Sequence, residues 1–150
     1  MKFETILKNE NDTKKFAKKI EEHKFKNMIL CLNGDLGAGK TFFTKSLAEL
    51  LGVNETVTSP TFTIIKEYNK GKLPLFHMDV YRLDGFYEGV GIEEYFEKDG
   101  IVIIEWAETI KEILPFERLD ISINVLNETE RKLILQPFGK KYEKLCEVII

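Results

Sequence analysis

Residues 34–41 carry the residue types that bind nucleotide phosphates. The segment fits the pattern G-x-x-x-x-G-K-S/T. Its glycines let successive backbone N–H groups point at one anion, the lysine neutralises phosphate charge, and the threonine hydroxyl is a ligand for Mg²⁺. The segment therefore predicts a site for a nucleoside triphosphate and its magnesium ion. We expect the contacts to come from Asp35, Leu36, Gly37, Ala38, Gly39, Lys40 and Thr41.

Two carboxylates are candidates for the chemistry at this site. Phosphoryl transfer needs an acidic group near the metal ion and a group that orients the attacking oxygen. Glu105 follows the apolar run 101–104, at the strand end where ligands of open α/β sheets gather, and we expect it to bind the metal. Asp79 lies near the end of another predicted strand and could reach the same metal, although a surface charge is the alternative for it. The expected catalytic residues are thus Lys40, Asp79 and Glu105.

Three other side chains lie near these residues in the sequence. Thr61 is at the centre of segment 59–63, where switch segments of P-loop proteins contact the γ-phosphate, but its hydroxyl could instead begin a strand. Trp106, the only tryptophan, follows Glu105 and is predicted to stack on a partner, to shield the site or to be a core residue. His77 is expected to be neutral and hydrogen-bonded.

The elements that must position these residues follow from apolar periodicity. The unbroken apolar run 28–32 predicts a strand buried on both faces, and residues 40–51 have the apolar spacing of a helix that Gly52 ends. Strand, glycine loop and helix thus follow one another, as the phosphate-binding motif requires. The run 101–104 predicts a second central strand.

The rest of the chain predicts antiparallel pairs and further helices. A helix capped by Asn11 or Asp12 is expected, another over 86–97, and a short one after Trp106 that ends before Pro115. Runs 61–68 and 73–81 flank a turn, and runs 119–125 and 131–135 form a second hairpin. The prediction is one P-loop domain over residues 1–150, an α/β fold with a mixed parallel and antiparallel sheet flanked by helices.

Composition excludes several classes of function. The chain has 150 residues, 43% of them hydrophobic, and a net charge of −3, which does not favour tight binding to nucleic acid. The two cysteines lie far apart, so neither a metal site nor a disulfide framework is indicated. We see no secretory start and no apolar run of bilayer length, and therefore expect a cytoplasmic protein without membrane contact.

Four motifs occur together in one order: GDLGAGKT at 34–41, SPTFT at 59–63, HMDVYRL at 77–83 and EWAE at 105–108. In this combination the chain resembles the bacterial TsaE family, the ATPase of tRNA threonylcarbamoyladenosine biosynthesis, over residues 13–137. The resemblance implies ATP and Mg²⁺ as ligands. It also implies a partner heterodimer of sugar-kinase-like proteins, of the TsaB and TsaD type, with tRNA bound only through that complex.

The resemblance also implies roles for individual residues. Lys40 and Thr41 would hold phosphate and magnesium, Glu105 would complete the metal shell, and Asp79 would serve hydrolysis. Thr61 would be the switch-like contact and Trp106 a functional aromatic at the site. Thr13 and Arg131 would approach the nucleotide base. The chain departs from the family pattern at Ala107, where proline is more usual, and at Phe42, where a second threonine is common.

Two other functions remain as alternatives. A small-molecule kinase usually closes an arginine-bearing lid over the transferred phosphate, whereas the three arginines here are scattered over different predicted elements. A nucleotide-gated binding module would use ATP to dock on a partner without turnover of its own. A GTPase is disfavoured because Asn-Lys-Gly-Lys at 69–72 has lysine where guanine recognition needs a carboxylate.

Overall fold

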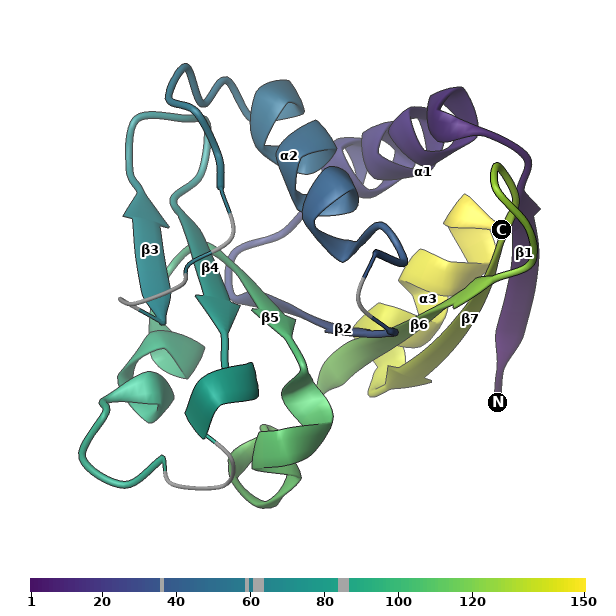
Figure 1. Ribbon diagram of the computed structural model, residues 1–150. Helices are drawn as coiled ribbons and strands as arrows, with labels where there is room; N and C mark the ends of the chain where they lie inside the picture. The colour runs from purple at the N-terminus through teal and green to yellow at the C-terminus, as the bar shows by residue number, and fades with distance from the viewer. Residues whose placement is uncertain (36, 59, 61–63, 84–86) are drawn as a thin grey trace.

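Seven strands of the described residues join into one sheet, in the order β1-β7-β6-β2-β5-β4-β3 (Figure 1). The computed structural model describes residues 1–35, 37–58, 60, 64–83 and 87–150. The strands are β1 (Phe3–Leu7), β2 (Met28–Asn33), β3 (Ile65–Tyr68), β4 (Leu75–Asp79), β5 (Ile101–Glu105), β6 (Arg118–Val125) and β7 (Arg131–Phe138). The four central strands β6, β2, β5 and β4 are parallel, while β1, β7 and β3 pair antiparallel at the two sides. The predicted mixed-sheet α/β fold is confirmed.

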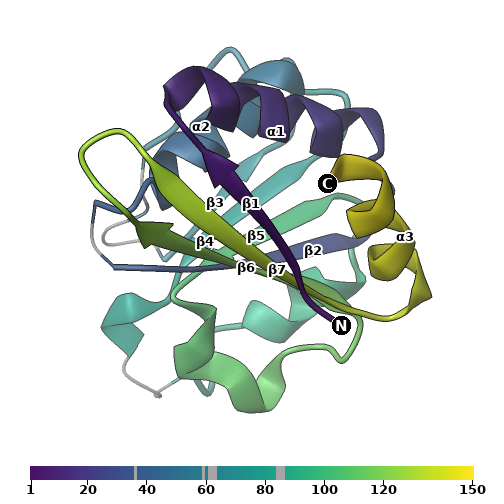
Figure 2. The ribbon, with the colours of Figure 1, turned by 90° about the vertical axis from the view of Figure 1, so that its right-hand side faces the viewer.

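Helices of different kinds cover the two faces of the sheet. The helices α1 (Glu10–Glu22) and α2 (Lys40–Leu50) lie on one side, and the 3₁₀ helices lie on the other (Figure 2). These are η1 (Tyr81–Leu83), η2 (Ile92–Glu97) and η3 (Ala107–Ile113). The helix α3 (Lys140–Ile149) shares the core of α1 and α2. Because a 3₁₀ helix is short, the second face is built from small pieces around the ends of β4 and β5.

The central strand β2 shows why the apolar runs become strands. Its side chains alternate between the two faces, so that Leu30 and Leu32 join the core beneath α1 and α2. Ile29 and Cys31 join the second core beneath the 3₁₀ helices. A strand buried on both faces must be apolar throughout, which is what residues 28–32 are. The predicted strands 28–32 and 101–104 are therefore confirmed as β2 and β5.

The structure corrects two predictions about secondary structure. Asn9, rather than Asn11 or Asp12, caps α1, because its side chain accepts a hydrogen bond from the backbone N–H of Asp12 at 3.0 Å. The helix expected over 86–97 is shortened to the 3₁₀ helix Ile92–Glu97. Gly89 and Gly91 have φ of 78° and 83°, and this left-handed backbone interrupts a continuous helix. Residues 84–86 lie outside the described residues.

Two elements at the sides of the sheet were not predicted at all. The short strand β1 pairs with β7. The helix α3 packs on the face of the sheet that α1 and α2 also cover. The helix α3 is fixed to the central strand by Tyr142, whose hydroxyl accepts a hydrogen bond from the Ile29 N–H at 2.9 Å. Among the described residues, no helix has both the length and the apolar character needed to cross a membrane.

Candidate active site

The carboxyl ends of β2, β5 and β4 meet at one edge of the sheet. In the parallel register Leu32 pairs with Glu105, and Glu105 pairs with Asp79. The loop that follows β2 leads directly into α2, which begins at Lys40. The topology therefore brings the three predicted catalytic residues, Lys40, Asp79 and Glu105, to the same edge. This is the place where open α/β sheets bind their ligands.

The backbone of the loop 34–41 turns at glycines. Gly37 and Gly39 have φ of 80° and 109°, and no atom lies within 4 Å of a Cβ built on either, so the space beside them is open. Gly39 caps α2 and offers no side-chain hydrogen bond to the first N–H groups of that helix. A cradle of this kind suits an anion at a helix N-terminus. Leu36, another predicted contact, lies outside the described residues.

Gly34 allows the loop to pass close to β6. A Cβ at this position would stand 2.7 Å from the backbone carbonyl oxygen of Ile123, which is far too close for a carbon atom. The clashing oxygen belongs to the backbone of β6, which cannot move aside as the end of a flexible side chain could. Only glycine therefore lets the chain leave β2 along this path.

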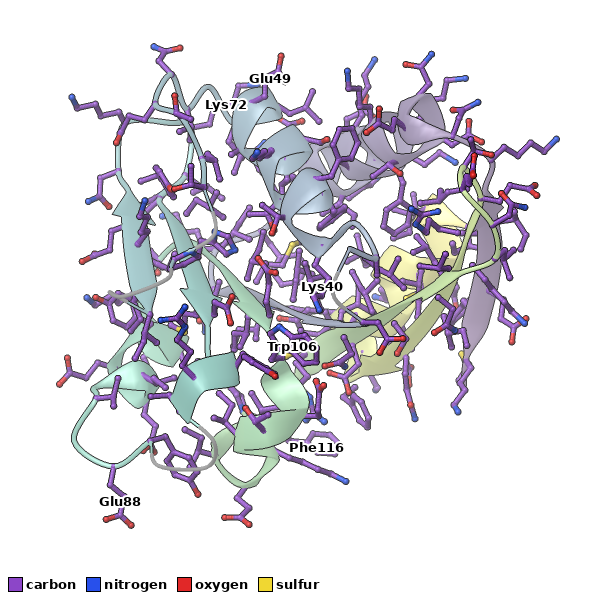
Figure 3. The ribbon with its side chains drawn as sticks, viewed as in Figure 1. Lys40, Glu49, Lys72, Glu88, Trp106 and Phe116 are labelled. Atoms are coloured by element: carbon purple, nitrogen blue, oxygen red, sulfur yellow. The ribbon has the colours of Figure 1, made fainter. Side chains whose placement is uncertain are left out.

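Lys40 is buried at the centre of the site, with 5% of its surface exposed. Its ammonium donates a hydrogen bond to the Gly34 carbonyl and lies 3.7 Å from the centre of the Trp106 ring (Figure 3). It forms no ion pair with any carboxylate in the described part of the chain. Burial lowers the pKa of Lys40, and nearby carboxylates, Glu105 first among them, oppose this shift. A buried cation without a direct anionic partner fits a phosphate group.

A hydroxyl and a carboxylate converge beside the lysine. The Thr41 hydroxyl oxygen lies 3.4 Å from each carboxylate oxygen of Glu105, which is 3% exposed. These are the hard oxygen ligands that Mg²⁺ prefers. The described residues contain no cluster of three or more His, Cys, Asp and Glu side chains that could hold a metal alone. The pair therefore fits a magnesium ion that takes its remaining ligands from phosphate and water.

Asp79 and His77 both project from β4 toward this edge. Asp79 is half-buried at the end of the strand, and its Oδ1 accepts a hydrogen bond from the Tyr81 N–H at 3.1 Å. His77 is fully buried, and its Nε2 lies 2.5 Å from Oε2 of Glu105. The expectation that His77 is hydrogen-bonded is confirmed. Its position two residues before Asp79 puts both side chains on the same face of the strand.

Trp106 forms an aromatic wall on the other side of Lys40. Its backbone has φ of 64°, a left-handed conformation that is uncommon for a large side chain. This conformation caps η3, while the Trp106 N–H donates to the Leu32 carbonyl at 3.1 Å. The indole lies 4.7 Å from the ring of Tyr81, centre to centre, and is half-buried. An unusual backbone conformation of this kind often marks a functional site.

A cavity of about 520 Å³ opens beside the phosphate loop. Four predicted residues line it, namely Thr13, Ala38, Gly39 and Arg131. Arg131 also supports the loop, because its Nε donates to the Ala38 carbonyl at 3.0 Å. The cavity mixes apolar walls with a few polar groups and has a size that suits a planar base with its sugar. Thr61, the predicted switch contact, lies outside the described residues.

Further residues of the cavity were missed from the sequence. They come from the cap and first turn of α1, from α2 and from the turn between β6 and β7: Asn9, Asn11, Phe42, Phe43, Glu128 and Thr129. Asn9 had a detectable signal, because asparagine before a helical run is a preferred cap. The residues of the distant turn had none, because their place depends on how β1 and β7 pair.

Comparisons with known proteins agree on one family. The model of the family described as "Threonylcarbamoyl adenosine biosynthesis protein TsaE" matches residues 7–133. The tRNA threonylcarbamoyladenosine biosynthesis protein TsaE of Bacillus subtilis (strain 168) is 49% identical over 147 residues, which are 98% of this chain and 92% of that protein. The protein of the same name from Rickettsia felis is 39% identical over 130 residues, 84% of this chain and 75% of its own. The crystal structure of Bacillus subtilis YdiB has a TM-score of 0.85 at 44% identity, covering 99% of this chain and 94% of that one.

Proposed function

Because this chain belongs to the TsaE family of threonylcarbamoyl adenosine biosynthesis proteins, we propose that it binds Mg-ATP on residues 34–41 and hydrolyses it during tRNA modification. One observation carries the proposal. The Lys40 ammonium is buried beside an open, glycine-lined loop and has no carboxylate partner among the described residues. Such a charge is costly to bury unless an anion binds it, and a nucleotide triphosphate supplies that anion.

Different residues of the site bind the phosphates, the metal ion, the attacking water and the base. Backbone N–H groups of the loop and the Lys40 ammonium hold the β- and γ-phosphates. Thr41 and Glu105 would hold Mg²⁺, which supplies charge neutralisation on the phosphates when bound. Asp79, beside Glu105 in the sheet register, orients the attacking water, directly or through the metal shell. The cavity between Thr13 and Arg131 receives the base and its sugar.

We expect ATP hydrolysis to take place in a complex with partner proteins. The partner is a heterodimer of sugar-kinase-like proteins, of the TsaB and TsaD type, which would bring the tRNA. A kinase acting on small molecules is less well supported, because two of the three arginines are engaged elsewhere. Arg118 pairs with Asp120 at 2.9 Å, and Arg131 supports the loop backbone. Neither is placed to close as a lid over a transferred phosphate.

Calorimetry and phosphate release test the proposal together. ATP, ADP and GTP are titrated into the purified chain with Mg²⁺ or with EDTA, and phosphate release is followed with and without the heterodimer. We expect ATP to bind in a magnesium-dependent way and hydrolysis to increase when the heterodimer is present. Absence of ATP binding would overturn the proposal. Binding to the heterodimer that requires ATP but releases no phosphate would replace hydrolysis by a nucleotide-gated module.

Asp79→Asn is expected to retain ATP affinity within about threefold and to lose turnover by roughly 10²-fold or more. Asparagine keeps the size and the Oδ1 acceptor that receives the Tyr81 N–H, but removes the charge that orients or activates water. Binding is measured by calorimetry and turnover by phosphate release with the heterodimer. Equal turnover in the variant and the parent would assign Asp79 to the surface rather than to the chemistry.

A further inference from the structure

His77 is the one histidine of the described residues with no solvent exposure, and it contacts the expected metal ligand directly. Its Nε2 lies 2.5 Å from Oε2 of Glu105, the shortest hydrogen-bond contact of that carboxylate within the described part of the chain. We propose that His77 is a positioning residue that fixes the Glu105 carboxylate toward Thr41. This inference rests on the proposed function, since it gives His77 a role only if Glu105 holds a metal ion.

The sheet register explains how the imidazole reaches the carboxylate. On the parallel strands β4 and β5, His77 pairs with Ile103, and Asp79 pairs with Glu105. Side chains two residues apart share a face, and Ile103 belongs to the core beneath α1 and α2. His77 and Glu105 therefore project toward the helix that carries Thr41. The imidazole lies one residue pair further from the carboxyl end of the strands than Glu105 does, so it meets the carboxylate from the core side.

The two neighbours of the carboxylate differ in how tightly they hold it. The Thr41 hydroxyl lies 3.4 Å from both oxygens, a loose arrangement that favours neither of them. The imidazole is in close contact with Oε2 alone, and this contact is shorter than those of the Thr41 hydroxyl with either oxygen. The imidazole therefore determines the rotation of the carboxylate, and Thr41 does not. Carboxylates that bind metals are commonly held by a second hydrogen-bonding group in this way.

The other ring nitrogen shows that the contact with Glu105 is the specific one. Nδ1 of His77 is buried and has no hydrogen-bond partner among the described residues. Since a carboxylate accepts, Nε2 carries the hydrogen that is donated to Glu105. A histidine kept only to fill the core would gain nothing from a polar edge without a partner, and an apolar residue would fill the same space better. The hydrogen bond to Glu105 therefore explains why a histidine is buried at this position.

Substitutions at position 77 separate this role from packing. His77→Gln can place its amide nitrogen near the position of Nε2, whereas His77→Leu fills the core without a donor. Binding of a non-hydrolysable ATP analogue is measured by calorimetry over a range of Mg²⁺ concentrations and also in EDTA. We expect the Mg²⁺ concentration for half-maximal binding to rise roughly 10- to 100-fold in the leucine variant. We expect glutamine to restore most of that loss, and the affinity in EDTA to stay unchanged in both.

A second background tests whether the effect passes through Glu105. In Glu105→Gln, adding His77→Leu is expected to change the Mg²⁺ requirement no further, because the carboxylate to be positioned is gone. An unchanged Mg²⁺ requirement in the single leucine variant, or equal losses with leucine and glutamine, would overturn the role of His77. Failure of the parent protein to bind the analogue at all would instead overturn the proposed function, and this inference with it.

His77→Leu removes a polar side chain from a fully buried position, so its folding is checked by circular dichroism. If circular dichroism shows that His77→Leu is unfolded, the comparison passes to His77→Gln and His77→Asn, which are both polar amides. Asparagine is one carbon shorter and presents its amide at the position of Nδ1, away from Glu105. We then expect asparagine to raise the Mg²⁺ requirement and glutamine to preserve it. Equal behaviour of the two amides would overturn the proposal.

Discussion

Lys40→Ala is expected to lower kcat/KM for ATP hydrolysis by at least roughly 10²- to 10³-fold, the scale at which a single preorganised donor contributes to charge stabilisation. The ammonium is buried, lies next to the open loop and has no carboxylate partner among the described residues. Arg131 also contacts the loop, but its Nε donates to the Ala38 carbonyl at 3.0 Å and so supports the backbone. Phosphate release with the partner heterodimer measures the effect.

Two variants separate charge from packing in this experiment. Lys40→Met keeps an unbranched apolar side chain beside Trp106 and should be as inactive as Lys40→Ala. It should also unfold at no lower temperature than the parent, because burial already disfavours the charged form of Lys40. Lys45→Met, on the exposed side of the same helix, is the matched control and should behave as the parent. Hydrolysis within a few-fold of the parent in Lys40→Met would contradict the assignment.

Glu105→Gln is expected to raise the Mg²⁺ concentration needed for ATP binding by about 10- to 100-fold and to reduce turnover at least as much. Glutamine preserves the shape of the side chain and an oxygen that can accept the hydrogen bond from His77. It removes the negative charge beside Thr41 that a divalent cation requires. Calorimetry over a series of Mg²⁺ concentrations measures binding, and phosphate release measures turnover.

The control for this variant is Glu108→Gln, because Glu108 is an exposed carboxylate that also acts on Lys40 through space. Its Mg²⁺ requirement should stay at the parent value. Circular dichroism should show that Glu105→Gln is folded, since the substitution replaces a buried charge by a neutral group of equal size. An unchanged Mg²⁺ requirement in a folded Glu105→Gln protein would exclude Glu105 as a metal ligand.

The phosphate loop and the central strands could be predicted because their signals are local. Residues 28–32 form an apolar run, the glycine loop follows, and the helix then begins at Lys40, all within a short stretch of chain. Glu105 could be placed at the same edge because a short apolar run ended beside it. A parallel sheet aligns such strand ends without further information.

Other features could not be predicted because they depend on contacts between distant segments. The contact of His77 with Glu105 follows from the register of β4 on β5, which no local pattern reports. The prediction of a helix over 86–97 was wrong, because glycines with positive φ interrupt the helical backbone that the apolar spacing indicated. The cavity walls were missed for a related reason, since Asn9 and Thr129 come together only through the pairing of β1 with β7.

The pairing of β1 with β7 also has a consequence for biosynthesis. Phe3 lies opposite Leu135, so β1 leaves the ribosome well before the strand with which it pairs. The glycine loop and α2 emerge much earlier and can form their local structure first. A nascent chain can thus contain the glycine loop and α2 while the neighbouring cavity still lacks the residues that β7 contributes. The cavity is completed only when β7 has left the ribosome and places Arg131 and Leu133 beside Leu7.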